Sequence, residues 1–202
     1  MSTLAVTTTA LADLNVAWIT TRAAGIVALV TSTASIVLGL SLAGRMSKGP
    51  GKLGDVRMLH QTLGIATVVA LAVHVVSLLF DPWLKPALSE LAIPFTLSYR
   101  PLYTGLGITA GYGIIVLGMS GFLRQRLGAR WNVIHRFTGL AWVAAVIHTI
   151  GSGSDYGTVW MTVILLGCVA PVLVVLAMRL AKRRGTPSRP TRRTASPPAA
   201  RA

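Results

Sequence analysis

The chain is poor in acidic residues and in cysteine. Among 202 residues there are five Asp and Glu together and one Cys. A single cysteine excludes an intrachain disulfide, and Cys168 lies in an apolar stretch, where we interpret it as a small packing residue. The lack of carboxylates deep inside the apolar stretches disfavours a proton relay, without excluding it, since such relays usually employ intramembrane Asp or Glu.

Long hydrophobic runs are what the chain has in abundance. Hydrophobic residues make up 53% of it, charged residues 12%, and the mean hydropathy is +0.67. This composition predicts a multi-pass protein of the cell membrane, with the lipid bilayer as its surroundings. A helix needs about 20 residues to cross the hydrocarbon. We therefore expect an all-α bundle of five transmembrane helices, at 16–40, 57–80, 101–123, 131–151 and 157–180.

The basic residues that give the chain its net charge of +14 are concentrated in a few segments outside the predicted spans. Basic residues gather between spans one and two, between spans three and four, and after span five, which predicts that these segments are cytoplasmic. The N-terminus is then outside. Because membrane topology explains the basic residues, the net charge does not indicate a nucleic-acid partner. We expect a short extracytoplasmic N-terminus at 1–15, a membrane domain at 16–180, and a disordered basic cytoplasmic tail at 181–202. The N-terminal segment does not resemble a signal peptide.

All four histidines lie within predicted spans. His60 and His74 are 14 residues apart in span two, and His135 and His148 are 13 apart in span four. An ionisable side chain in hydrocarbon is costly and suggests function. Spans two and four run parallel, so His60 pairs in depth with His135 near the cytoplasm and His74 with His148 near the outside. At 1.5 Å per residue the two levels are about 20 Å apart, too far for one compact zinc site.

The surroundings of the histidines favour a flat, bulky guest. The segments HQTLGIATVVALAVH and HRFTGLAWVAAVIH form an internal repeat that places two similar helices together. One helical turn from each histidine, toward the membrane centre, is a small residue: Gly64, Ala70, Gly139 and Ala144. Each pair is therefore predicted to hold one haem iron as two axial ligands.

The 13-residue step of span four does not fit a straight helix. At about 100° per residue, 14 residues return to nearly the same face, whereas 13 residues end roughly 140° away. We expect span four to bend, to contain a bulge, or to carry one histidine at a loosened end.

Cations near each level could neutralise haem carboxylates. Arg57 and Arg136 flank the inner pair, and Arg22 is the one basic residue clearly inside a span, where a charge usually has a buried partner. Lys85 and Arg100 are further outer candidates. Anchoring to lipid headgroups is the alternative role for such residues.

Residues 16–180, with His60, His74, His135 and His148 at spacings of 14 and 13, resemble the ferric reductase-like transmembrane domain family. This family includes the membrane parts of NADPH oxidases, iron reductases and a bacterial methionine-sulfoxide reductase system. The resemblance implies two b-type haems, held by His60/His135 on the inner side and His74/His148 on the outer side. The family usually has six spans, and its larger members add a flavin- and NADPH-binding module, for which this sequence contains no nucleotide-binding fingerprint.

The sequence therefore predicts an electron-transfer subunit, an oxidoreductase component that needs a separate donor. A cytoplasmic flavin reductase or a membrane quinol would reduce it, and an extracytoplasmic acceptor or redox protein would oxidise it. The alternative is a non-catalytic haem-binding scaffold or sensor in the membrane.

Overall fold

The computed structural model describes residues 15–44 and 52–184. All regular structure in this part of the chain is helical. Five helical stretches are long and apolar enough to cross a membrane: Val16–Ala43, Leu53–Leu78, Pro101–Leu127, Ala129–Ser152 and Val159–Lys182. The predicted all-α bundle with five spans is confirmed, each within a few residues of its expected position. The expectations for the N-terminal segment and most of the basic tail concern residues outside the described ranges.

Five long helices form the bundle: α2 (Val16–Ala43), α3 (Lys52–Leu78), α5 (Pro101–Met119), α8 (Thr138–Ser152) and α9 (Val159–Arg184). Four short elements lie at its ends: α4 (Leu88–Ala92), η1 (Ser120–Leu123), α6 (Arg124–Leu127) and α7 (Ala129–Arg136). Together, η1 and α6 continue the third span beyond α5, and α7 begins the fourth.

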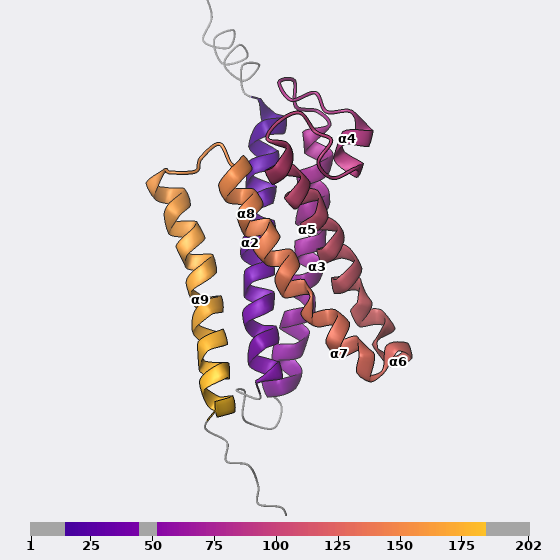
Figure 1. Ribbon diagram of the computed structural model, residues 1–202, viewed down its shortest axis with the longest axis vertical. Coiled ribbons are helices and arrows are strands. Elements are labelled where there is room, and N and C mark those ends of the chain that lie inside the picture. Colours follow the sequence, from indigo (N-terminus) through magenta and orange to yellow (C-terminus); the bar gives the residue numbers. More distant parts are fainter. Residues whose placement is uncertain (1–14, 45–51, 185–202) are drawn as a thin grey trace, which may run out of the picture.

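Two antiparallel hairpins make up most of the molecule. The helices α2 and α3 pack along their whole length, α5 packs on α8, and α9 lies outside against α2 (Figure 1). We call the end that carries α4 and the 81–100 segment the cap end, and the opposite end, with α6 and α7, the basic end (Figure 1). This arrangement places α3 and α8 parallel to each other, as the predicted pairing of histidines requires.

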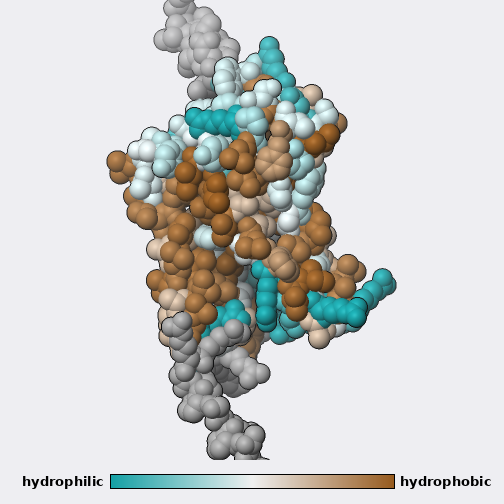
Figure 2. All heavy atoms as spheres, in the orientation of Figure 1, coloured by the Kyte–Doolittle hydropathy of each residue, from teal (hydrophilic) through white to brown (hydrophobic). Residues whose placement is uncertain are grey.

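The outer surface suits hydrocarbon. Large apolar side chains are exposed along the spans, among them Val69, Val116 and Leu166, which are 58%, 66% and 62% exposed. Figure 2 shows hydrophobic residues over the middle of the molecule and hydrophilic residues toward its two ends. Since the hydrophobic residues face outward along the helices, the bundle is a multi-pass membrane protein that contacts lipid.

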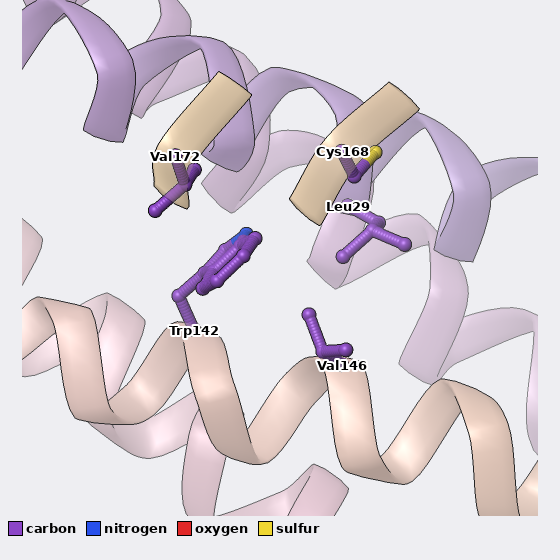
Figure 3. Packing of buried hydrophobic residues seen from close by; sticks show 5 residues of the cluster. All are labelled: Leu29, Trp142, Val146, Cys168 and Val172. Atoms are coloured by element: carbon purple, nitrogen blue, oxygen red, sulfur yellow. The ribbon is translucent and has the colours of Figure 1, made fainter. Parts of the chain in front are cut away.

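Trp142 joins α8 to α2 and α9. Its indole lies among Leu29, Val146, Cys168 and Val172 (Figure 3), and its Nε1–H donates to Thr33 Oγ1 at 2.9 Å. Cys168 is buried in this cluster, as expected for a packing residue. A buried indole needs a hydrogen-bond acceptor, which Thr33 provides inside the bundle.

The fourth span is interrupted at Phe137, one residue after α7 ends and one before α8 begins. The Phe137 N–H bonds to Ile134 O three residues back, instead of four, at 3.1 Å. His135 is the penultimate residue of α7, whereas His148 lies in α8. The predicted distortion of span four is confirmed, and it separates the two histidines of this span onto two helical segments. The second span, by contrast, is one uninterrupted helix.

Candidate metal centres

The four histidines form two pairs across the gap between the hairpins. The ring centroids of His60 and His135 are 6.0 Å apart with planes at 88°, near the basic end. Those of His74 and His148 are 6.4 Å apart with planes at 86°, near the cap end. The structure therefore brings together the partners that were predicted from depth, and gives the two pairs nearly the same geometry.

Each imidazole directs its Nδ1 to a backbone carbonyl of the transmembrane span that precedes its own. His60 bonds to Ser35 O and His74 to Thr21 O, both at 2.8 Å, on α2. His148 bonds to Tyr103 O at 2.8 Å and His135 to Leu117 O at 3.3 Å, both on α5. A carbonyl oxygen only accepts, so Nδ1 must carry the proton in all four rings.

A proton on Nδ1 leaves Nε2 as the basic nitrogen of the neutral ring. The two nitrogens lie on opposite sides of an imidazole, so a ring whose Nδ1 points at α2 or α5 directs Nε2 away from that helix. Metal-binding histidines typically donate their second N–H in this way, which sets both tautomer and orientation. The arrangement thus leaves four Nε2 nitrogens, each with the lone pair that a metal ion would bind.

Three rings also lie directly against a glycine. A Cβ at Gly25 would approach His74 Nδ1 to 3.0 Å, and one at Gly39 would approach His60 Cε1 to 3.1 Å. A Cβ at Gly107 would overlap the His148 ring. In each case the glycine follows the hydrogen-bonded carbonyl by four residues, so one face of the helix supplies both contacts. Glycine allows the ring to approach the backbone closely enough for the hydrogen bond to form.

These supporting residues were missed in the sequence analysis, although a signal for them exists. In each hairpin, the residue whose carbonyl accepts from a histidine is followed four positions later by a glycine, and this pattern recurs after 14 residues. The pairs are Thr21/Gly25 and Ser35/Gly39 in the first hairpin, and Tyr103/Gly107 and Leu117/Gly121 in the second. The internal repeat therefore includes whole hairpins. The fourth pair differs, because Gly121 lies beyond α5 and a Cβ there would meet nothing within 4 Å.

The separation within each pair leaves room for one metal ion between the two imidazoles. An imidazole nitrogen binds a transition-metal ion at about 2.0–2.1 Å, and the ring centroid lies about 1.1 Å behind that nitrogen, so two opposed imidazoles have centroids about 6.3 Å apart. The observed 6.0 Å and 6.4 Å bracket this value.

Two protein ligands do not complete a coordination sphere. Within residues 15–44 and 52–184, no group of three or more His, Cys, Asp and Glu side chains is placed to hold a metal ion. A metal held by these pairs would need its remaining ligands from another source, and a tetrapyrrole supplies four equatorial nitrogens. The residues present therefore fit haem better than a bare ion.

A cavity of about 780 Å³ adjoins the cap-end pair. Its wall includes His74, His148, Gly25, Gly107 and Gly111, and the cap covers it with Trp83, Leu84, Leu88, Leu91, Leu97 and Tyr99. This volume lies within the usual range for cofactor sites, about 300–1,000 Å³. The 81–100 segment thus supplies part of the wall of this cavity.

The small residues beside the histidines only partly form the predicted shelves. A Cβ at Gly139 would meet nothing within 4 Å, so this position is open, whereas one at Gly64 would reach Ser35 Oγ at 4.0 Å. Ala70 and Ala144 are not among the residues that line the cap-end cavity. Space beside the cap-end rings is bounded instead by glycines of the neighbouring helices, which sequence periodicity within one helix does not reveal.

Arg22 lies on the wall of the same cavity and has the partner expected for a charge within a span. Its guanidinium forms an ion pair with Asp155, and its Cζ is 4.0 Å from the Trp18 ring centroid and 5.8 Å from that of Trp160. Its Nε and the Ser152 Oγ are buried without a hydrogen-bond partner in the described part of the chain, and both residues line the cavity. Polar atoms of this kind need a ligand or water.

The other predicted cations lie at the two ends. Arg57 and Arg136 have exposed side chains at the basic end, and Lys85 is exposed at the cap end. Arg100 donates through Nη1 to Gly151 O and lies over the Tyr99 ring, so it ties the cap to the end of α8. Of the predicted cations, Arg22 is the one that lines the cap-end cavity.

Comparison of the chain with known protein families, with curated proteins and with solved structures found no match. The interpretation of the site therefore depends on its own geometry.

Proposed function

We propose that this protein is a transmembrane electron-transfer subunit that binds two b-type haems, one at each histidine pair. The observation that carries the proposal is the shared geometry of the four imidazoles. Each ring has its Nδ1 on a neighbouring carbonyl, and the two pairs have centroid separations of 6.0 Å and 6.4 Å. A helical bundle with this geometry at two levels suits charge transfer across the bilayer.

His60 and His135 would hold the haem near the basic end, and His74 and His148 the one near the cap end. Bound haem supplies reversible one-electron chemistry at its iron. The carbonyls of α2 and α5 fix the ligand rings and raise the basicity of Nε2 through the Nδ1–H hydrogen bond. The step of 14 residues from His60 to His74 separates the levels by about 21 Å along α3.

Arg22 supports a cofactor that carries carboxylates, because it lines the cap-end cavity and its Nε–H has no hydrogen-bond partner in the described part of the chain. Ser152 would add a second hydrogen bond there. Apolar side chains of the cap line this cavity, which would lower the local dielectric and influence the redox potential of a bound haem.

The charge distribution gives a direction to the proposal. Exposed arginines, including Arg57, Arg126 and Arg136, gather at the basic end, which would face the cytoplasm of the cell. Electrons would then enter at His60/His135 from a flavoprotein or a quinol. They would leave at His74/His148 to an extracytoplasmic acceptor.

The test is a haem count with a reduced-minus-oxidised spectrum on the full chain, produced with sufficient haem and purified in detergent. We expect two haems per chain, both reducible, and one haem in each single variant His60→Ala, His74→Ala, His135→Ala and His148→Ala. Ile147→Ala, beside His148, is the matched control and should keep both, since Ile147 is 41% exposed and is not among the residues that line the cap-end cavity. A chain without haem, or histidine variants that keep two haems, would contradict the proposal. Two haems that no donor at the basic end reduces would favour the scaffold or sensor.

A further inference from the structure

The imidazole of His135 differs from the other three in how it is supported. Its bond to Leu117 O is 3.3 Å, against 2.8 Å for each of the others, and lies beyond the usual N–H···O range of about 2.7–3.2 Å. The glycine expected behind it, Gly121, lies outside α5, in the 3₁₀ turn η1, and approaches no ring. The helix itself ends one residue after His135. The Leu117 carbonyl and Gly121 therefore hold the His135 ring less firmly than their counterparts hold the other three rings.

An aromatic ring occupies the place of the missing support. Trp131, four residues earlier on α7, stacks on His135 with ring centroids 4.8 Å apart and planes at 18°. The Cζ of Arg124 is 5.8 Å from the Trp131 ring centroid, so a cation also holds the indole. Trp131 and His135 share one face of α7, because residues four apart lie above one another on a helix.

We propose that Trp131 is the positioning residue of the metal ligand His135. The indole restricts rotation of the imidazole about its side-chain bonds, as the glycine backbone does for His60, His74 and His148. The role of His135 as a ligand rests on the proposed function, whereas the support by Trp131 concerns the apoprotein as well.

Three variants separate positioning from general stability. Trp131→Leu removes the stack but keeps an apolar side chain, and Trp131→Phe keeps an aromatic ring. Phe122→Leu is the matched control, since Phe122 is an aromatic residue of the same corner, is 73% exposed, and has no ring contact with a histidine. The full chain is prepared both with haem and under haem-limited expression.

In haem-free protein, the rate of carbethoxylation of His135 is measured by mass spectrometry. We expect it to rise about 5-fold in Trp131→Leu, in line with the loss of one aromatic contact, and less than 2-fold in Trp131→Phe and Phe122→Leu. The rate at His74 should not change. Equal rates at His135 in all variants, or an equal rise at His74, would overturn the proposal, and this holds whether or not the chain binds haem.

In haem-loaded protein, the midpoint potential and the electron paramagnetic resonance g-values of each site are measured. Trp131→Leu should shift those of the basic-end haem and leave the cap-end haem unchanged, and Trp131→Phe should restore them. Shifts at both sites, or a Phe variant that behaves like the Leu variant, would show a merely structural role. A wild-type chain without haem would refute the proposed function, and the modification rates would still decide the role of Trp131.

Discussion

His148 lies so close to Gly107 that a Cβ on residue 107 would overlap its imidazole ring. The same ring donates its Nδ1–H to Tyr103 O, one helical turn earlier on α5. Backbone carbonyl and glycine act together here, because the hydrogen bond forms only if nothing but hydrogen projects from residue 107. The orientation of a predicted metal ligand thus depends on the smallest side chain of a different helix.

Gly107→Ala should displace His148 and break its hydrogen bond to Tyr103 O. We expect haem at the cap-end site to be lost or strongly reduced, with the basic-end site retained, and unfolding to be easier by about 1–3 kcal/mol, as for other overpacking changes. Haem content and thermal unfolding in detergent measure both effects. Gly118→Ala is the control on the same helix, because a Cβ there meets nothing within 4 Å. A Gly107→Ala protein with two normal haems would contradict the expectation.

The register of the fourth span can be tested by insertion. One Ala inserted between Phe137 and Thr138 restores a 14-residue spacing but moves His135 relative to His148 by about 100° and 1.5 Å. We expect the basic-end haem to be lost and the cap-end haem to remain, since the break at Phe137 already matches the 13-residue step. Visible and paramagnetic resonance spectra distinguish the two sites. An inserted Ala in the loop after Gly157 should change neither.

The Arg22–Asp155 ion pair should contribute measurably to stability. Its side chains are 28% and 22% exposed, so solvent screens the pair only partly. Asp155→Asn leaves Arg22 without its counter-charge and should cost about 1–2 kcal/mol, between values for exposed and buried pairs. A double-mutant cycle with Arg22→Gln measures the coupling between the two charges. No coupling, together with unchanged unfolding in Asp155→Asn, would show that the pair does not hold the α8–α9 connection.

The side chains of Trp142 and Thr33 should be coupled in their contributions to the free energy of unfolding, and their substitution should leave the haem sites unchanged. Trp142→Phe and Thr33→Val each remove one side of the 2.9 Å hydrogen bond. We expect a coupling free energy of about 0.6 kcal/mol, the average for such bonds between membrane helices. Thermal unfolding of the two single variants and the double variant gives this value. A change of haem spectrum in either variant would instead place Trp142 in the site.

Much of the site could be predicted from the sequence because its signals are local. Hydropathy over about 20 residues reveals the spans, and the parallel course of spans two and four follows from counting the span between them. The depth match of His74 with His148 needs nothing more than the rise per residue. The break near His135 was also predictable, because 13 residues do not return to one face of a helix.

The supporting contacts could not be predicted in the same way. Gly25, Gly39 and Gly107 could not be recognised as supports of the histidines, since nothing in α2 or α5 alone indicates which helix they face. Ala70 and Ala144, chosen by their position beside a histidine, do not line the cap-end cavity. The partner of Arg22 also remained open, because Asp155 is 133 residues away along the chain.

The sequence by itself determined the number of spans, the depth of each histidine and the irregularity of the fourth span, because hydropathy and helical periodicity act over short stretches of chain. The tertiary structure alone decided that α2 supports α3 and α5 supports α8, and thereby which nitrogen of each imidazole is bound. The physical reason is that backbone carbonyls are identical in every residue. Which of them meets a histidine depends on how two helices pack.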